Sequence, residues 1–115
     1  MYDVAFKERK RRKYSPPKTK FSPSKEVIQN ISTMLTQHSL ERMGQRGISI
    51  LDICAAILYG TYYQGRGVEI VVIGKKEVRK SKVKLYPYSG IHVVIASGRI
   101  ITTYRNRELQ LRYRY

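Results

Sequence analysis

The spacing of apolar residues changes at Gly60, and this change limits the folds that the chain can adopt. Before Gly60 the apolar residues recur at helical spacing, first over residues 27–35 and again in a denser run over residues 50–58. After it come short β-branched runs bounded by glycines, of which residues 67–74 are the clearest. Helices followed by strands predict an α+β fold, with N-terminal helices packed on one face of a small antiparallel sheet of three to four strands.

Polar residues and glycines mark the expected helix ends. The first helix is expected to begin at Ser22 or Ser24, because a serine side chain caps free N–H groups of the first turn. Thr36 predicts a break and a second helix, which ends at Gly47, a residue type that favours the left-handed conformation after a last turn. Ser49, with an acidic residue three positions later, predicts the start of a third helix.

Three further segments are expected to form strands. Residues 77–85 alternate weakly and predict an edge strand or a long ribbon. Residues 91–96 and 99–104 flank Ser97-Gly98, a dipeptide that favours a two-residue hairpin turn. The basic face of the expected edge strand consists of Lys80, Lys82 and Lys84.

The charge of the chain points to a polyanionic partner. Its 115 residues carry 23 Lys and Arg against 8 Asp and Glu, a formal net charge of +15. Such an excess favours nucleic acid, because phosphate contacts dominate the affinity of proteins that bind it. We expect RNA as the partner, with DNA as the second polyanion. The alternative is that the charge only keeps one small domain in solution.

Basic residues gather at both ends of the chain. Residues 1–22 form a basic arm with too little apolar surface to order itself, residues 23–106 a single domain, and residues 107–115 a tail rich in arginine and tyrosine. Phosphate contacts are expected from these ends at Lys7, Arg9, Lys10, Arg11, Arg12, Lys13, Arg107, Arg112 and Arg114.

Further nucleic-acid contacts are expected within the domain. The chain has ten tyrosines and no tryptophan, and tyrosines in predicted loops beside basic residues suit base stacking; packing at the domain edge is the alternative. Gly65-Arg66-Gly67 is only loosely similar to a phosphate-binding loop and is better explained as a hairpin connection. The expected contacts here are Tyr63, Arg66, Lys80, Lys82 and Lys84.

The second expected helix carries the strongest candidate site. His38, Arg42 and Arg46 recur every four residues, so they share one helix face that is expected to meet solvent, with Leu40 and Met43 turned inward. Two guanidinium groups in line suit a phosphate chain, and a histidine moves protons near neutral pH.

Each of these residues also has a structural alternative. His38 would cap a neighbouring main-chain group at the helix start. Arg42 would form a salt bridge with Asp52 or Glu41, and Arg46 would complement the helix C-terminus.

Metal-free RNA cleavage uses the ribose 2′-OH as nucleophile and needs a base, an acid and cations around the phosphate. His38 is the expected base or acid, beside its two arginines. Thr103 and Arg105 share a face of the last expected strand and extend the candidate catalytic set. His92 lies among Val and Ile and is expected to be a core or cross-strand residue. The sequence shows no metal-ligand cluster, so neither a metal nor a cofactor is expected.

The order of these motifs resembles that of a known family. Residues 38–49 match an H-x-x-x-R-M-x-x-R-G-I-S opening, and residues 90–106 match an apolar hairpin with a T-x-Y or Y-R-N ending. The resemblance covers about residues 36–106. The family that the chain resembles is an uncharacterised bacterial family of small domains. This family is grouped with RelE- and BrnT-like toxins and with metal-independent ribonucleases of the barnase, EndoU and colicin type. It implies a RelE-like arrangement of helices on a small antiparallel sheet, and RNA cleavage.

Two functions follow from the sequence. The first is a toxin-like, metal-independent endoribonuclease that cleaves through the ribose 2′-OH, with an acidic antitoxin protein as partner. The second is a nucleic-acid-binding module without chemistry that uses the same basic, tyrosine-rich surface. An interaction protein that meets an acidic partner is a third alternative.

Cys54, the one cysteine of the sequence, is informative about the redox compartment. It lies in an apolar run, so we expect a small buried hydrophobe rather than a nucleophile, and a reducing, cytoplasmic location. The charged N-terminus lacks a following apolar stretch, so no secretory signal is expected. The longest apolar runs are too short to span a membrane, and no membrane partner is expected.

Overall fold

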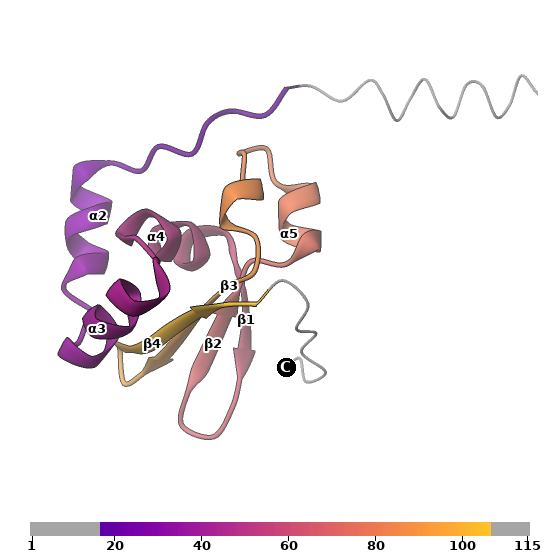
Figure 1. Cartoon of the computed structure of the whole chain (residues 1–115). Coiled ribbons are helices and arrows are strands. Elements are labelled where there is room, and N and C mark those ends of the chain that lie inside the picture. The colour runs from indigo at the N-terminus through magenta and orange to yellow at the C-terminus, as the bar shows by residue number, and fades with distance from the viewer. Residues whose placement is uncertain (1–16, 107–115) are drawn as a thin grey trace, which may run out of the picture.

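The computed structural model describes residues 17–106, and the predicted α+β fold is confirmed (Figure 1). Three helices precede a four-stranded antiparallel sheet, and a further helix lies between its second and third strands. The elements are α2 (Lys25–Ser32), α3 (Gln37–Arg46), α4 (Ile50–Tyr59), β1 (Thr61–Gln64), β2 (Glu69–Val72), α5 (Lys75–Lys80), the 3-10 helix η1 (Tyr86–Tyr88), β3 (Ile91–Ala96) and β4 (Arg99–Arg105).

The strands follow one another in the sheet in the order β1-β2-β3-β4, and every neighbouring pair is antiparallel. Ser97 and Gly98 form the turn between β3 and β4 with φ angles of 51° and 74°, the positive values that a two-residue hairpin turn favours. The expected hairpin is therefore confirmed. The register shifts between Val94 and Ile95, which places one bulge in this pair of strands.

The centre of the core is α4. Its residues Ile53, Cys54 and Ala55 are fully buried, and Val71 and Val93 of the central strands pack in the same cluster. Cys54 is thus the small buried hydrophobe that the sequence predicts, and burial raises the pKa of its thiol.

The cap residues that the sequence predicts are confirmed. Of the two expected starts for α2, Ser24 is the cap, and its hydroxyl accepts a hydrogen bond from the main chain of the first turn. Thr36 and Ser49 each begin their helix with a capping box. Gly47 ends α3 with a φ of 65°.

The free edge of β4 is covered by α3 and the segment before it (Figure 1). The Ile100 N–H donates to the Met34 carbonyl oxygen at 2.8 Å, and the Thr36 hydroxyl donates to the Ile100 carbonyl oxygen at 2.8 Å. At the other end of the helix, Arg46 Nη1 donates to the Thr103 carbonyl oxygen at 2.8 Å. These bonds satisfy edge groups that would otherwise be open to pairing with another chain.

The chain passes from α4 into the sheet at Gly60, where there is no room for a side chain. A Cβ atom at this position would lie 2.5 Å from the Ala56 carbonyl oxygen and 2.7 Å from Val71 Cγ1. Glycine therefore allows the end of α4 to approach β2 closely.

The expected strand over residues 77–85 is wrong. The helix α5 covers the beginning of this segment, and Val83 contributes only an isolated bridge. Glu77 explains the helix, because its Oε1 accepts a hydrogen bond from the Gly74 N–H at 2.7 Å and its Oε2 accepts one from the Thr61 hydroxyl. The three lysines of the expected basic strand face therefore lie on the end of a helix and on the loop after it.

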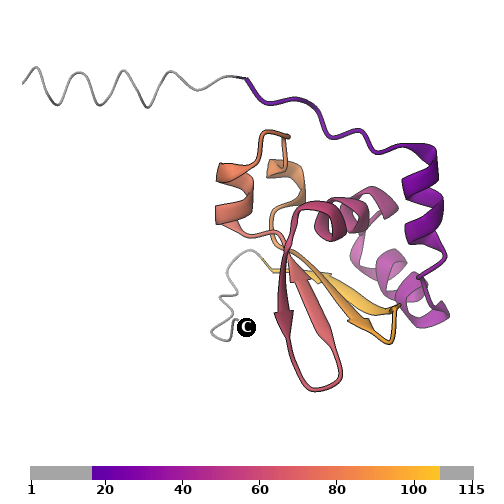
Figure 2. The ribbon, with the colours of Figure 1, turned by 180° about the vertical axis from the view of Figure 1, so that it is seen from behind.

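The described segment before α2, residues 17–24, packs on the rest of the domain. Phe21 is buried, and its ring makes edge contacts with Tyr59 and Tyr88. Thr19 pairs with Val83 in an isolated parallel bridge. Figure 2 shows this segment running across the molecule between α5 and α2.

Candidate nucleic-acid interface

His38 and Arg42 lie together on the outer side of α3. His38 is exposed and Arg42 is half-buried, and Arg42 Nε donates to His38 Nε2 at 3.2 Å. This bond confirms that the two side chains share a face, as their four-residue spacing predicts. The alternatives of a capping role for His38 and of a salt bridge from Arg42 to Asp52 or Glu41 are wrong in this structure.

Two further predictions for α3 concern the positions of Leu40 and Arg46. Met43 is buried, as predicted, but Leu40 is 48% exposed, so its predicted inward position is wrong; Ser39 is buried in its place. Ser39 takes the inward position because its hydroxyl belongs to the capping box at the helix start. Arg46 binds the Thr103 carbonyl oxygen, so it holds the edge of β4 rather than standing free on the helix face.

The two candidate catalytic residues of β4 do not join the pair on α3. Thr103 is fully buried, and its hydroxyl donates to the His92 carbonyl oxygen at 2.8 Å. Its side chain therefore links β4 to β3 and does not reach a ligand at the surface. Arg105 Nη2 lies 3.5 Å from Asp52 Oδ1 at the start of α4. The five residues of the expected catalytic set are thus spread along α3 and β4, and only His38 and Arg42 interact through their side chains.

His92 is a core residue, as expected. It is fully buried, its ring stacks on Tyr104 with 4.7 Å between centroids, and its Nδ1 lies 2.8 Å from the Gly90 carbonyl oxygen. Burial lowers the pKa of His92, and the hydrogen bond to Gly90 partly opposes this. Its Nε2 has no hydrogen-bond partner among residues 17–106.

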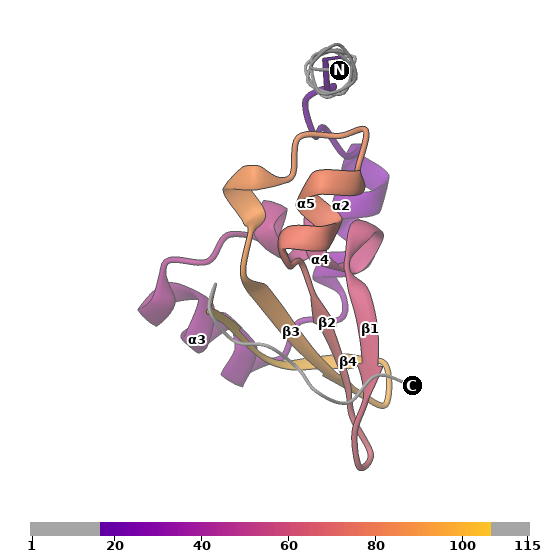
Figure 3. The ribbon, with the colours of Figure 1, turned by 90° about the vertical axis from the view of Figure 1, so that its right-hand side faces the viewer.

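The helix α5 lies at the opposite end of the domain from α3 (Figure 3). Cationic residues occur in α5, in the loop after it and in the segment before α2 that pairs with this loop. Lys18 Nζ donates to the carbonyl oxygens of Val78 and Arg79, and this bond joins the segment before α2 to the last turn of α5. We call the whole group the α5 basic surface. It consists of Lys18, Lys20, Lys75, Lys76, Arg79, Lys80, Lys82 and Lys84.

The acidic residue within this group, Glu77, is already engaged. Its two oxygens accept hydrogen bonds from Thr61 and Gly74. Among residues 17–20 and 75–84, which contain the eight cations, Glu77 is the one acidic residue, and its carboxylate holds α5 against β1.

A groove of about 580 Å³ opens within the α5 basic surface. We call it the lysine groove. Its lining residues come from the end of α4, the start of β1, α5 and the following loop: Tyr59, Thr61, Lys76, Glu77, Lys80, Ser81, Lys82 and Val83. Tyr59 was not predicted as a site residue, because in the sequence it reads as the last apolar position of a core helix.

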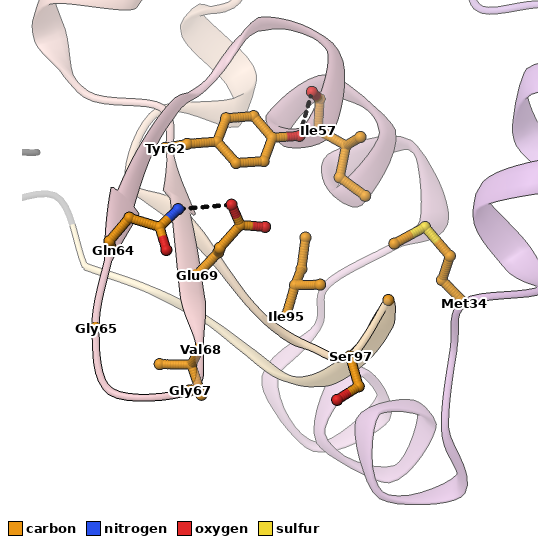
Figure 4. Close-up of a pocket in the computed structure, with 11 residues that line it drawn as sticks. Met34, Ile57, Tyr62, Gln64, Gly65, Gly67, Val68, Glu69, Ile95 and Ser97 are labelled. Carbon is orange, nitrogen blue, oxygen red and sulfur yellow. Dashed lines mark hydrogen bonds between the residues drawn. The ribbon is translucent and has the colours of Figure 1, made fainter.

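A second groove, of about 440 Å³, lies at the other end of β1 (Figure 4). We call it the Glu69 groove. Met34, Ile57 and Ile95 form apolar walls, while the Glu69 carboxylate accepts a hydrogen bond from Gln64 Nε2 at 2.7 Å. Among the described residues that line this groove, none carries a positive charge.

The remaining predicted contacts fall in different places. Tyr63 lies in β1 and is half-buried, so its expected loop position is wrong. Arg66 is exposed in the connection between β1 and β2, which confirms the hairpin interpretation of Gly65-Arg66-Gly67. The predicted contacts outside the described residues are Lys7, Arg9, Lys10, Arg11, Arg12, Lys13, Arg107, Arg112 and Arg114.

The fold and its surface define a small α+β domain with a basic end. Comparison with protein families places it: a family model described as a domain of unknown function (DUF4258) matches residues 35–113, and the chain belongs to that family. The matched region begins just before α3 and includes α4, α5 and the whole sheet. Neither the curated proteins nor the solved structures gave a significant match.

Two searches of the described residues gave negative findings. No helix in this part of the chain is both long and apolar enough to cross a membrane. Residues 17–106 also contain no group of three or more His, Cys, Asp or Glu side chains placed to hold a metal ion.

Proposed function

We propose that this protein binds RNA through the α5 basic surface. The observation that carries the proposal is the gathering of eight cations around α5 against one carboxylate whose oxygens are both engaged. Such a patch attracts a phosphate backbone and releases the counterions condensed on it. DNA presents the same phosphates and is the second ligand to test.

The test is the salt dependence of RNA binding, measured by fluorescence anisotropy with the full chain. We expect the affinity to fall steeply as salt rises. The double variant Arg79→Gln, Lys84→Gln should flatten the plot of log affinity against log salt, by about 0.7 for each lost phosphate contact on a single strand. Both residues are exposed on the α5 basic surface and neither lines the lysine groove.

A matched control removes the same charge elsewhere. Lys25 and Arg99 are exposed residues at the starts of α2 and β4. The double variant Lys25→Gln, Arg99→Gln should keep the slope of the native protein. Equal flattening by both pairs would show that the net charge, rather than this surface, drives binding.

RNA cleavage at α3 is a second candidate function, supported by the exposed imidazole of His38 beside the guanidinium of Arg42. In this proposal His38 Nε2 takes the proton of the ribose 2′-OH and Arg42 moves onto the phosphate. The resemblance of residues 36–106 to a family grouped with RelE- and BrnT-like toxins also supports it. Burial of Thr103 and the Arg105–Asp52 contact count against the larger catalytic set.

Cleavage is tested with structured and single-stranded RNAs in the presence of a metal chelator. The products should carry 2′,3′-cyclic phosphates, and His38→Ala should lower kcat by about a hundredfold. Gln37→Ala, at the neighbouring exposed position, should cleave like the native protein. Equal cleavage by native protein and His38→Ala would place the activity elsewhere.

We also propose a cytoplasmic setting and an acidic protein as a competing partner for the α5 basic surface. The free, buried thiol of Cys54 is compatible with a reducing compartment. Fractionation of cells and capture of partners with the full chain test these two points.

A further inference from the structure

The lysine groove combines an aromatic side chain with positive charge. Tyr59 is 40% exposed, and the edge contact with Phe21, at 5.9 Å between centroids and 81° between ring planes, covers only part of its ring. Lys76, Lys80 and Lys82 line the groove beside it. The remaining surface of the groove is mainly apolar, because it consists of the stems of lysine side chains and a tyrosine ring.

The walls of this groove are held in place by contacts on two sides. Glu77 ties α5 to β1 through the Thr61 hydroxyl, and Lys18 binds the last carbonyl oxygens of α5. Phe21 is buried and supports Tyr59 from the segment before α2. The groove is therefore formed before a ligand arrives, and its volume of about 580 Å³ lies within the roughly 300–1,000 Å³ of typical ligand sites.

We infer that the lysine groove takes one unpaired nucleotide of a single-stranded RNA. The base stacks on Tyr59, and the phosphates on either side meet Lys76, Lys80 and Lys82. This inference rests on the proposed function, since it assigns the substrate form bound by the α5 basic surface.

Charge and geometry select this occupant. The lysines of the groove favour a polyanion, and a tyrosine face between cations suits a nucleobase, since every base has a π-face. In a duplex the bases are paired and stacked inside the helix, so they do not reach a side-chain ring in a surface groove. The groove therefore predicts a preference for single strands, with little preference for sequence.

The Glu69 groove supplies a matched comparison. Tyr62 lines it and is 40% exposed, the same fraction as Tyr59. Its neighbours are the Glu69 carboxylate and apolar side chains rather than lysines, and its hydroxyl donates to the Ile57 carbonyl oxygen at 3.0 Å. A phosphate chain is repelled there, so Tyr62 serves as the control tyrosine.

The experiment measures anisotropy of the full chain with three labelled oligonucleotides: a single-stranded RNA, a hairpin duplex, and a strand with an abasic site in place of each base. Tyr59→Leu should weaken single-strand binding about tenfold, the effect of losing one stacked base. Tyr59→Phe, which keeps the ring, and Tyr62→Leu should bind within about twofold of the native protein. Tyr59→Leu should leave the salt slope and the duplex affinity unchanged.

The abasic strand keeps the test valid if Tyr59→Leu unfolds, which its thermal melting curve would reveal. The native protein should bind this strand about tenfold more weakly than the normal strand, because phosphates remain but stacking is lost. Equal affinity of the native protein for the two strands overturns the inference.

Other results would also overturn it. If Tyr59→Leu and Tyr62→Leu bind the single-stranded RNA with equal affinity, Tyr59 is not part of the site. Salt-sensitive binding in the same experiment would still support the proposed function. Loss of duplex binding in Tyr59→Leu would indicate a structural effect. Competition by polyglutamate as strong as by single-stranded RNA, at equal charge, would assign the groove to an acidic protein. If no RNA binds with salt sensitivity, the proposed function itself fails.

Discussion

The lysine groove and the Glu69 groove lie at the two ends of β1 and differ in charge. Each is lined by a tyrosine that is 40% exposed, Tyr59 in the first and Tyr62 in the second. In the lysine groove the tyrosine has three lysines around it, whereas in the Glu69 groove it faces a carboxylate. The lysine groove has three lysines and one carboxylate, Glu77, whereas the described lining of the Glu69 groove has one carboxylate and no lysine. Two tyrosines three positions apart in the chain therefore differ in the net charge of their surroundings.

This difference shows that the positive charge of the described residues is not spread evenly over their surface. Exposed aromatic rings and high net charge by themselves suggest stacking on nucleic acid at either tyrosine. The local charges decide between them, because a phosphate close to a ring is stabilised by neighbouring ammonium groups and repelled by a carboxylate.

The largest expected effect is at Gly60, which lies between the tyrosines of the two grooves in the chain. Gly60→Ala should lower the free energy of unfolding by about 1–3 kcal/mol, because the new methyl group overlaps the Ala56 carbonyl oxygen and Val71. Urea unfolding followed by circular dichroism measures this. Gly44→Ala, at an exposed helix position with nothing within 4 Å, is the control and should not destabilise. A stable Gly60→Ala variant would contradict the close approach of α4 to β2.

A charge reversal should remove the electrostatic difference between the grooves. Lys80→Glu should weaken RNA binding about thirtyfold at low salt, since one attraction is lost and one repulsion is added, each worth about 1 kcal/mol in water. The difference from the native protein should shrink at high salt, because mobile ions screen exposed charges. Lys25→Glu makes the same change at the start of α2 and should have a smaller effect; equal effects would mean that the groove has no special role.

Low pH should lower the free energy of unfolding through His92, a buried residue of β3. Burial lowers its pKa in the folded state, so the unfolded chain binds a proton more readily. Stability should therefore fall as the pH drops below the ordinary value of 6.5, and continue to fall until the lowered pKa is reached. His92→Phe keeps a ring against Tyr104 and should lose this part of the pH dependence in unfolding experiments. An unchanged pH dependence would show that His92 does not contribute.

The smallest expected effect is on the Tyr62 hydroxyl. Burial first, and the negative charge of Glu69 second, raise the pKa of Tyr62 above 10.0. Glu69→Gln should lower that pKa only part of the way, because burial remains. Titration of labelled tyrosines by NMR measures it, with Tyr104 as the internal control, since its pKa is raised by burial and lowered by Arg46. A pKa of Tyr62 that does not move would contradict the charge assigned to this groove.

Helix ends and the hairpin turn were predictable because they depend on neighbours in the chain. The caps at Ser24, Thr36 and Ser49 bind main-chain groups three residues away, and the turn at Ser97-Gly98 needs only its own backbone angles. The pairing of His38 with Arg42 follows equally from helical spacing. The sequence alone therefore determined that helices precede the sheet, the caps of those helices, the final hairpin and one side-chain pair.

Other features depend on residues far apart in the chain. Arg46 and Thr103, expected at a catalytic site, instead bind main-chain oxygens that are 57 and 11 positions away. The helix α5 replaced an expected strand because Glu77 binds both Gly74 and Thr61. The weak alternation of apolar residues over residues 77–85 gives no information about a hydrogen bond to Thr61.

The lysine groove was decided by tertiary structure alone. Its tyrosine and its lysines are separated by about twenty positions, and the contact of Glu77 with Thr61 brings the two segments together. In the sequence, Tyr59 belongs to an apolar helix and Lys76, Lys80 and Lys82 to a basic run. Composition determined that the protein carries a strong positive charge, but only the packing of α5 against β1 placed that charge beside an exposed ring.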